Sequence, residues 1–277
     1  MTDQNIANAG RPNAGRIYDY YLGGHHNFEI DRQVADKITE ILSFTPKAAL
    51  LQRWCLRDIA QELTQNRGYD VIIDFASGLP TQDHLHYVVP AGTTVIYSDH
   101  DPIVVEYAHQ ILGSSDSEPL ATINGVKTAF FQADARQPEE LLSRPEVQKA
   151  LDGSRKAALI FWGVGGYLAD AEINQSLSYL YEWSDPQSCL VLNAQFASGN
   201  PDHPAIQQVL EIYKQMGSTV HLRSLERYQE LAQPWQVDAG GFVSLLDWHG
   251  FDQSLIGEDL SAVGKTGVGY GGYLVKA

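Results

Sequence analysis

The sequence predicts an α/β fold in which helices cover a mostly parallel β-sheet. From residue 71 onward, short β-branched runs alternate with helical stretches, which is typical of βαβ units. Several of these runs end in an aspartate. Two strand-like segments near residue 277 follow each other closely and predict an antiparallel hairpin at one sheet edge. Five parallel strands and this hairpin make a seven-stranded sheet.

Length and composition fit one α/β domain. The 277 residues are enough to bury a substantial core. The 34 acidic and 19 basic side chains give a net charge of −15, which disfavours nucleic acid and anionic membranes as partners, although it could also serve only solubility. Cys55 and Cys189 lie in apolar stretches, which predicts buried thiols. Export and membrane-spanning segments are not found, so we expect a cytoplasmic protein.

The first 67 residues predict a helical segment ahead of a sheet domain spanning residues 68–277. Apolar residues recur every four positions between residues 28 and 42, which predicts a helix with one buried face. Thr45 and Pro46 predict the start of the next helix, with the threonine as N-cap. We expect this helix to stop near residue 68 and to turn three side chains inward, namely Trp54, Ile59 and Leu63.

Strands and helices alternate through the second part. The expected strands span residues 71–75, 94–97, 128–132, 158–162 and 190–194. Helices are expected to begin at Asp101-Pro102, at Asp170 as N-cap, and at His203-Pro204. Near the end of the sequence we expect a short helix over residues 242–250, a strand over 251–256 and a last strand over 270–277.

The first expected strand leads into a turn of small residues. Asp74 ends the strand, and Ala76, Ser77 and Gly78 follow, where a ligand could approach the backbone closely. Only one glycine of a dinucleotide-binding turn is present, which disfavours a nicotinamide-dependent oxidoreductase. The turn suits a ligand without phosphate and with a positive charge near Asp74. A purely structural turn is the alternative.

Acidic residues also end the next two strands. Asp99 follows Gly78 by 21 residues, the spacing that brings a carboxylate to a ribose diol, with His100 beside it. For Asp101 we favour an ordinary N-cap. Asp134 could accept from an adenine amino group, with Ala135 leaving room for the ring. Together the acidic strand ends would line the crevice beyond the sheet, where open α/β folds bind ligands.

Glycines and aromatic residues follow the fourth expected strand. Gly163 could let two ligands meet, with Trp162 or Tyr167 as a wall of the site. A structural turn is an equally good explanation.

Four segments resemble one known family. They read GRIYDYYLGGHHNFEIDR, DFASGLPTQDHLH, IYSDHDPIVVEYA and FQADARQPEELL, and the resemblance runs from about Ile17 through Leu168. The sequence is similar to the family labelled S-adenosyl methyltransferase, formerly a domain of unknown function and common in actinobacteria. Methyltransferases at large usually have a glycine at or near the position of Ala76, and residues 235–250 match the family poorly.

The resemblance implies a Rossmann-like fold that binds S-adenosylmethionine. It implies that Asp74, Ala76, Ser77 and Gly78 surround the amino-acid end of the cofactor. It implies further that Asp99 holds the ribose, and that Asp134 and Ala135 hold the adenine.

The segment of residues 18–32 is unusually rich in polar and aromatic side chains. One hypothesis makes it a cover over the crevice that helps to bind substrate, and the alternative makes it a structural helix pair. The substrate candidates are Tyr18, Tyr21, His25, His26, Asn27, Trp162 and Tyr167. Adjacent histidines point apart, so we expect no metal site.

The leading interpretation is a methyltransferase that acts on a small molecule. A non-catalytic protein that binds the same cofactor is the alternative. No residue is assigned as a general base, and Tyr21, His25 and His26 are the first positions to test.

Overall fold

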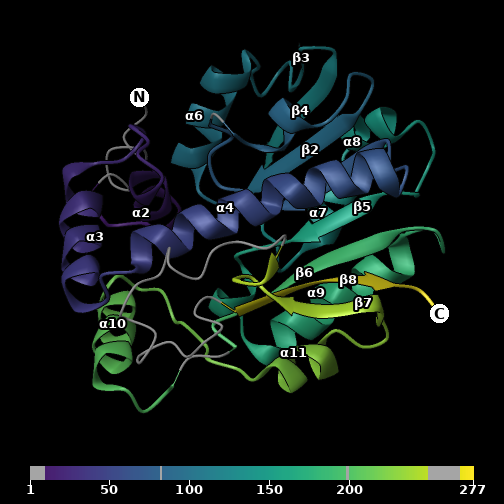
Figure 1. The fold of residues 1–277 in the computed structure, drawn as a ribbon. Helices are drawn as coiled ribbons and strands as arrows, with labels where there is room; N and C mark the ends of the chain where they lie inside the picture. The colour runs from purple at the N-terminus through teal and green to yellow at the C-terminus, as the bar shows by residue number, and fades with distance from the viewer. Residues whose placement is uncertain (1–9, 82, 198–199, 249–268) are drawn as a thin grey trace.

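The fold is built around one eight-stranded sheet (Figure 1). The computed structural model describes residues 10–81, 83–197, 200–248 and 269–277. The strand order is β3-β4-β2-β1-β5-β6-β8-β7. The strands span Val71–Phe75 (β1), Thr94–Asp99 (β2), Leu120–Ile123 (β3), Val126–Gln132 (β4), Ala158–Phe161 (β5), Cys189–Gln195 (β6), Gln236–Ser244 (β7) and Gly269–Val275 (β8). The expected α/β class and mostly parallel sheet are confirmed, because β4, β2, β1, β5 and β6 pair in parallel.

The eighth strand was not expected from the sequence. β3 pairs antiparallel with β4 through Ile123 and Val126. Asn124 and Gly125 connect them with φ values of 52° and 80°. These are the positive φ angles of a two-residue hairpin turn, for which Asn-Gly is the strongest short-range signal. The prediction of seven strands was wrong because this signal was overlooked.

At the other edge, β8 lies between β6 and β7 and is antiparallel to both. The expected C-terminal antiparallel pair is confirmed, with β8 as its second strand. The expected helix from residue 242 is wrong, because Phe242 and Ser244 pair with Gly272 and Tyr270. Pairing with β8 therefore overrides the helical spacing of the apolar residues there. The strand expected over residues 251–256 lies outside the described residues.

Most helix starts agree with the sequence. The helices span Ala14–Tyr21 (α2), Glu29–Ile41 (α3), Thr45–Gln61 (α4), Leu85–Val88 (α5), Pro102–Leu112 (α6), Pro138–Leu142 (α7), Pro145–Leu151 (α8), Asp170–Trp183 (α9), Pro204–Gln215 (α10) and Leu225–Leu231 (α11). The expected starts at Asp101-Pro102 and His203-Pro204 are confirmed.

Two expected N-caps are wrong. Phe44 takes the cap position of α4, and the Thr45 hydroxyl donates to the Leu42 carbonyl instead. Ala169 takes the cap position of α9 because Glu172 accepts a hydrogen bond from its N–H at 2.7 Å. Asp170, the first residue of α9, binds two arginines instead.

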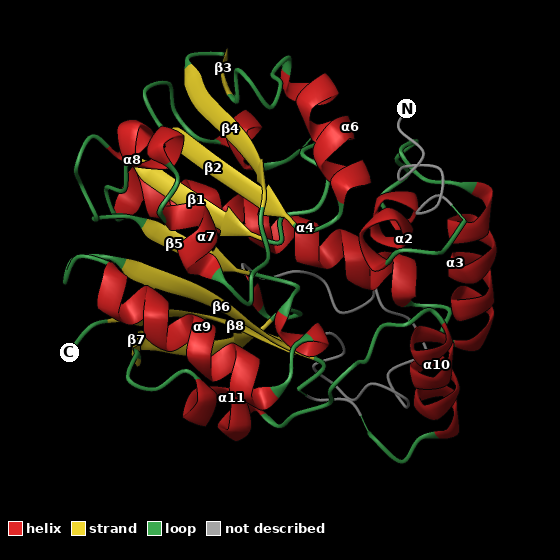
Figure 2. Ribbon diagram, turned by 180° about the vertical axis from the view of Figure 1, so that it is seen from behind, coloured by secondary structure: helices red, strands yellow, loops and turns green. Residues whose placement is uncertain are grey.

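Two hydrophobic cores lie on the two faces of the sheet. α4 crosses one face in Figure 1, and α7 and α9 cover the opposite face, seen in Figure 2. α4 brings Ile59, and the π-helical turn Glu62–Asn66 that continues it brings Leu63, into a core shared with β1 and β2. Both side chains are fully buried as expected, whereas Trp54 is only half-buried. The buried state expected for Cys55 and Cys189 is confirmed. The boundary at residue 67 stays a prediction, although α4 shares its core with the sheet.

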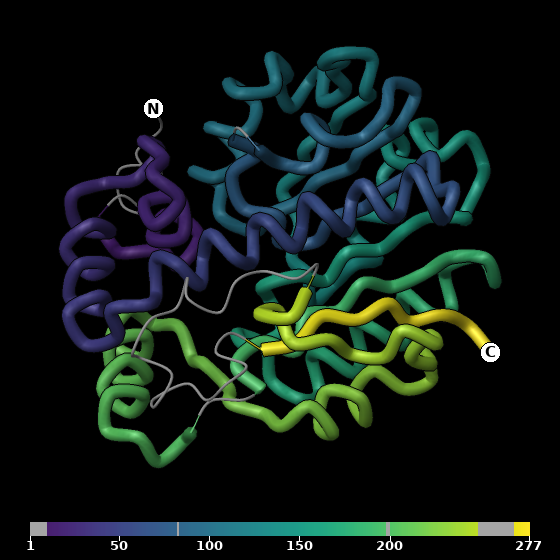
Figure 3. The backbone as a smooth tube through the Cα atoms, in the orientation of Figure 1, coloured from purple at the N-terminus to yellow at the C-terminus, as the bar shows by residue number. Residues whose placement is uncertain are grey.

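α2, α3 and α10 form a separate group beside the sheet. α10 lies next to α3 although some 160 residues separate them in the sequence, as the tube in Figure 3 shows. The group stands at the carboxyl ends of the parallel strands (Figure 2). In the part of the chain that the structure describes, every helix is too short or too polar to cross a membrane.

Candidate functional site

A cavity of about 630 Å³ lies between the carboxyl ends of the strands and the helices α2, α3, α4 and α10. Its volume is within the range that small-molecule sites usually have. The cofactor candidates that line it are Asp74, Ala76, Ser77, Gly78, Asp99, His100, Asp134 and Gly163, and the substrate candidates are Tyr18, Tyr21, Trp162 and Tyr167. The strand ends and part of the N-terminal helical segment therefore line one cavity.

The turn after β1 is held in a left-handed conformation. Ala76 has φ 56° and Gly78 has φ 64°. The alanine costs roughly 1 to 2 kcal/mol in this conformation. The Ser77 N–H donates to the Ser98 carbonyl at 2.8 Å, and the Gly78 N–H donates to Asp99 Oδ2 at 3.1 Å. The end of β2 therefore fixes a strained turn at the cavity wall.

Two buried groups of opposite charge flank this turn. Asp74 is 1% exposed, and Arg53, on α4, is 5% exposed. Asp74 Oδ2 and Arg53 Nε and Nη1 have no hydrogen-bond partner among the described residues. Burial raises the pKa of Asp74 well above its ordinary value, the Arg53 charge opposes this shift, and Asp99 adds to it. Buried polar groups are normally paired, so a ligand is the natural partner of both.

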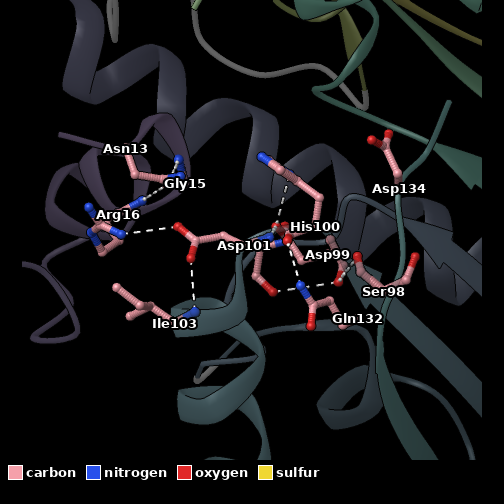
Figure 4. Close-up of polar contacts among 12 residues, drawn as sticks. Asn13, Gly15, Arg16, Ser98, Asp99, His100, Asp101, Ile103, Gln132 and Asp134 are labelled. Atoms are coloured by element: carbon pink, nitrogen blue, oxygen red, sulfur yellow. Dashed lines mark hydrogen bonds and ion pairs between the residues drawn. The ribbon is translucent and has the colours of Figure 1, made fainter. Parts of the chain in front are cut away.

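Asp99 is positioned by backbone groups on both sides (Figure 4). Its Oδ1 accepts a hydrogen bond from the Asp101 N–H at 3.0 Å, and its Oδ2 accepts from Gly78. His100 Nδ1 lies 3.4 Å from Oδ1. The hydrogen bond to Asp99 raises the pKa of His100, although burial opposes the shift. Backbone donors thus hold the Asp99 carboxylate at the cavity wall.

Asp101 is the N-cap that the sequence predicted, and it also binds Arg16 on α2. Its Oδ1 accepts from the Ile103 N–H at 2.8 Å, and its Oδ2 lies 3.0 Å from Arg16 Nη1. Arg16, 1% exposed, donates to Asp31 Oδ2 through Nε at 2.8 Å. One buried guanidinium therefore ties α2 and α3 to the first turn of α6, beside Asp99.

The residues after β4 separate into a cavity side and a core side. Asp134 lines the cavity, and its carboxylate accepts from Arg136 Nε through both oxygens, at 3.0 and 2.9 Å. Burial raises the pKa of Asp134, but the hydrogen bonds and charge of Arg136 outweigh it and lower the pKa overall. Ala135 does not line the cavity; it is buried in the sheet core with Phe131.

After β5, glycines allow close backbone packing. A Cβ at Gly166 would meet Gln195 Oε1 and the Phe196 ring, each at 2.9 Å. Tyr167 enters the cavity wall with its ring centroid 5.9 Å from that of Tyr213, on α10. Tight packing of this turn agrees with the structural explanation of the glycines, and Tyr167, which follows them, lines the cavity.

Three substrate candidates do not reach the cavity. Asp19 Oδ2 accepts from the His26 N–H and from Asn27 Nδ2, both at 2.9 Å. The His26 ring packs against Tyr107, and His25 is exposed. A Cβ at Gly24 would collide with the Asp19 carboxylate. These side chains stabilise the bend between α2 and α3, which matches the structural alternative for this part of the segment.

Several lining residues were missed by sequence reasoning. Gln52 and Arg53 line the cavity, and they follow Ala48 and Ala49 by four positions on the buried face of α4, which was an available signal. Tyr213 and residues 217–222 carried no such signal, because they reach the cavity only through the contact between α10 and α3. Within the described residues, no three His, Cys, Asp or Glu side chains gather as a metal site.

Comparison with known proteins identifies the family. A family model described as S-adenosyl methyltransferase matches residues 2–269. The search of curated proteins finds no match. A Thermobifida fusca YX structure, provisionally named a methyltransferase, is 26% identical with a TM-score of 0.79, over 98% of this chain and 97% of that chain.

Two further structures share the fold. A DUF574 family protein from Streptomyces avermitilis MA-4680 is 23% identical, with a TM-score of 0.80 over 97% of this chain and 99% of its own. Magnesium protoporphyrin IX methyltransferase from Synechocystis PCC 6803, solved with bound S-adenosylmethionine, is 12% identical, with a TM-score of 0.50 over 100% of this chain and 98% of its own. The fold is therefore the Rossmann-like fold of these proteins, and the chain belongs to the S-adenosyl methyltransferase family, whose cofactor is S-adenosylmethionine.

Proposed function

We propose that the chain transfers a methyl group from S-adenosylmethionine to a small molecule bound in the 630 Å³ cavity. The observation that carries this proposal is the buried pair of unpartnered groups on Asp74 and Arg53. S-adenosylmethionine supplies an activated methyl group on a positively charged sulfur. Its amino-acid end carries one ammonium and one carboxylate, which are the complements of Asp74 and Arg53.

The remaining cofactor contacts follow the strand ends. We assign the ribose to Asp99, with His100 beside it, and the backbone of Ala76, Ser77 and Gly78 to the amino-acid end. We assign the adenine edge to Asp134, which Arg136 keeps ionised as a hydrogen-bond acceptor. Ala135 leaves this set because its side chain is in the core.

The chain contributes binding, orientation and exclusion of water. Methyl transfer needs donor and acceptor held in line, and a protein can supply most of the acceleration by positioning. Tyr21 lines the cavity, but its hydroxyl already donates to the Ala35 carbonyl at 3.0 Å. His25 and His26 lie outside the cavity lining. We therefore assign no general base and expect the aromatic walls, Trp162 and Tyr167, to orient the acceptor.

Binding of S-adenosylhomocysteine to an Arg53→Met variant tests the proposal. This ligand keeps the amino-acid end of the cofactor, so loss of the guanidinium should weaken binding by at least about tenfold. Isothermal titration calorimetry measures the dissociation constant directly, without any acceptor. Arg57→Met is the control, because Arg57 lies on the same helix and forms only a half-exposed pair with Asp83 at 3.5 Å. Equal affinities of the two variants would contradict the proposal.

Proton release provides a second readout. Burial raises the pKa of Asp74, and an ammonium bound beside the carboxylate would favour its ionised form and lower this pKa again. Binding should therefore release a proton, and the affinity should rise with pH until Asp74 is ionised without ligand. The measured enthalpy should depend on the ionisation enthalpy of the buffer. Asp74→Asn should remove most of this buffer dependence.

A further inference from the structure

The cavity has two sides with different charge. Its four acidic lining residues, Asp74, Asp99, Asp134 and Glu172, come from the strand ends and from α9. The helical side, formed by α2, α3, α4, α10 and residues 217–222, contributes no carboxylate within the described chain. Its one fixed cation is Arg53, which lies near Asp74.

One part of the helical side is built from aliphatic and aromatic side chains. We call it the acceptor chamber and define it by six residues: Tyr21, Ile38, Leu42, Ile206, Val209 and Tyr213. They come from α2, α3 and α10 or from the ends of these helices. α3 and α10 lie side by side in Figures 1 and 2, so the chamber has walls on two sides. An apolar cavity of this kind suits a ligand that is itself largely apolar.

Several polar side chains of the cavity lining are neutral. Burial raises the pKa of Tyr167 and that of Tyr213, so both hydroxyls stay protonated at neutral pH. Trp162 also lines the cavity, and its buried Nε1 has no hydrogen-bond partner among the described residues. Burial and the charge of Arg223 lower the pKa of His221, which favours the uncharged imidazole. Neutral donors can satisfy a hydroxyl but leave an ion without a counter-charge.

We propose that the acceptor chamber binds an uncharged aromatic molecule that carries a hydroxyl group, as the methyl acceptor. This rests on the function proposed above and narrows it to a substrate class. The ring would pack against the tyrosine rings, and aromatic pairs in such contact gain about 0.5 to 1.5 kcal/mol beyond area burial. The hydroxyl would meet Tyr167, Tyr213 or Trp162.

A panel of three matched probes tests the proposal on the full chain. The protein is first saturated with S-adenosylhomocysteine and then titrated by calorimetry with 1-naphthol, 1-naphthoate and 1-naphthylmethylammonium at pH 7.5. The three probes share one ring system and differ in charge. We expect 1-naphthol to bind at least about tenfold more tightly than either ion, because burying an unpaired charge is costly. Equal or tighter binding of either ion overturns the proposal.

A variant with a charge in the chamber sharpens the test. Val209→Arg should lower the affinity for 1-naphthol at least about tenfold and make 1-naphthoate the probe that binds most tightly. Gln208→Arg is the matched control, because this neighbour on α10 is exposed and is outside the cavity lining. An unchanged preference in Val209→Arg, with a folded protein by circular dichroism, overturns the proposal.

A milder variant protects the test against misfolding. Tyr213→Phe should weaken the binding of 1-naphthol. It should leave the binding of naphthalene, which lacks the hydroxyl, unchanged. Affinity for S-adenosylhomocysteine separates the two proposals in the wild type. If S-adenosylhomocysteine does not bind, the proposed function fails. If it binds and 1-naphthol has no advantage over the ions, only the substrate class fails.

Discussion

At the residue scale, the buried His84 contacts the turn after β1, and the buried His86 contacts the neighbouring strand β2. His84 Nδ1 accepts a hydrogen bond from the Leu85 N–H at 2.9 Å, which leaves the proton on Nε2. Nε2 lies 3.3 Å from the Ser77 carbonyl and donates to it. His86 Nδ1 lies 2.8 Å from the Tyr97 hydroxyl, which also accepts the His86 N–H at 3.0 Å. Burial lowers the pKa of both His84 and His86, which favours the neutral form of both imidazoles.

The His86 imidazole makes stability depend on pH. Burial lowers its pKa from 6.5 to about 4. The unfolded chain binds a proton at His86 near pH 6.5 and the folded chain only near pH 4, so folding stability falls as the pH falls through this window. His86→Asn keeps an acceptor near the Tyr97 hydroxyl but cannot titrate. Urea unfolding between pH 6 and pH 4.5 measures how the free energy of unfolding changes with pH. In His86→Asn this change should be smaller than in the wild type by about 1.4 kcal/mol per pH unit, which corresponds to about one proton.

The exposed His25 provides the control for this measurement. His25→Asn should leave the pH dependence of the free energy of unfolding as it is in the wild type. A His86→Asn slope equal to that of the wild type would show that His86 is protonated in the folded state.

At the element scale, Arg223 joins the loop after β5 to the segment before α11. Its guanidinium donates to Asp170 Oδ1 at 2.6 Å, to the Gly165 carbonyl at 2.9 Å and to the Leu168 carbonyl. The His221 N–H donates to the Gly166 carbonyl at 2.7 Å. Two cavity walls, one with Tyr167 and one with residues 217–222, are thus fixed to each other.

Arg223→Lys should loosen both walls, because an ammonium cannot reproduce three planar donors. We expect hydrogen exchange at the His221 and Tyr167 amides to be at least about tenfold faster, measured by mass spectrometry or NMR. Arg227→Lys is the matched control, since Arg227 also binds Asp170 but is half-exposed. Equal exchange rates in the two variants would contradict this role of Arg223.

Elements built from local pattern were predictable, and contacts set by distant packing were not. The sequence predicts that Asp74 and Asp99 lie close together at the carboxyl ends of neighbouring strands, because both lie at the ends of parallel strands. The buried position of Arg53 follows from the helical spacing of α4, but its unpartnered atoms do not, because they depend on how α4 crosses the sheet. Tyr213 was missed because α10 must first pack on α3. Residues Phe242–Ser244 read as helical and form strand because β8 supplies a pairing partner.

At the scale of the whole molecule, α4 connects the helices α2 and α3 to the sheet. Its inward face joins the core over β1 and β2, and its first turns line the cavity together with α2. Removing α4 would expose the apolar residues of one sheet face to water. The N-terminal helical segment and the sheet are therefore expected to unfold together.

A pair of fragments tests this expectation. Residues 68–277 lack α4 and should show no sharp thermal transition by near-ultraviolet circular dichroism, because the face under α4 is uncovered. Residues 42–277 keep α4 and should unfold cooperatively, although without α2 and α3. A sharp transition in the shorter fragment would show that the sheet domain folds without the helical segment.

The position of β8 constrains the order in which the sheet is completed. It is the last of the described strands along the chain, yet it lies inside the sheet and separates β7 from β6. A ribosome releases the chain from the N-terminal side, so β7 emerges without its neighbour and waits with an unpaired edge. During synthesis β7 is thus open to pairing with other chains. Residues 269–275 then pair with one edge of β7 by inserting between β7 and β6, and the other edge of β7 stays the outer edge of the described sheet.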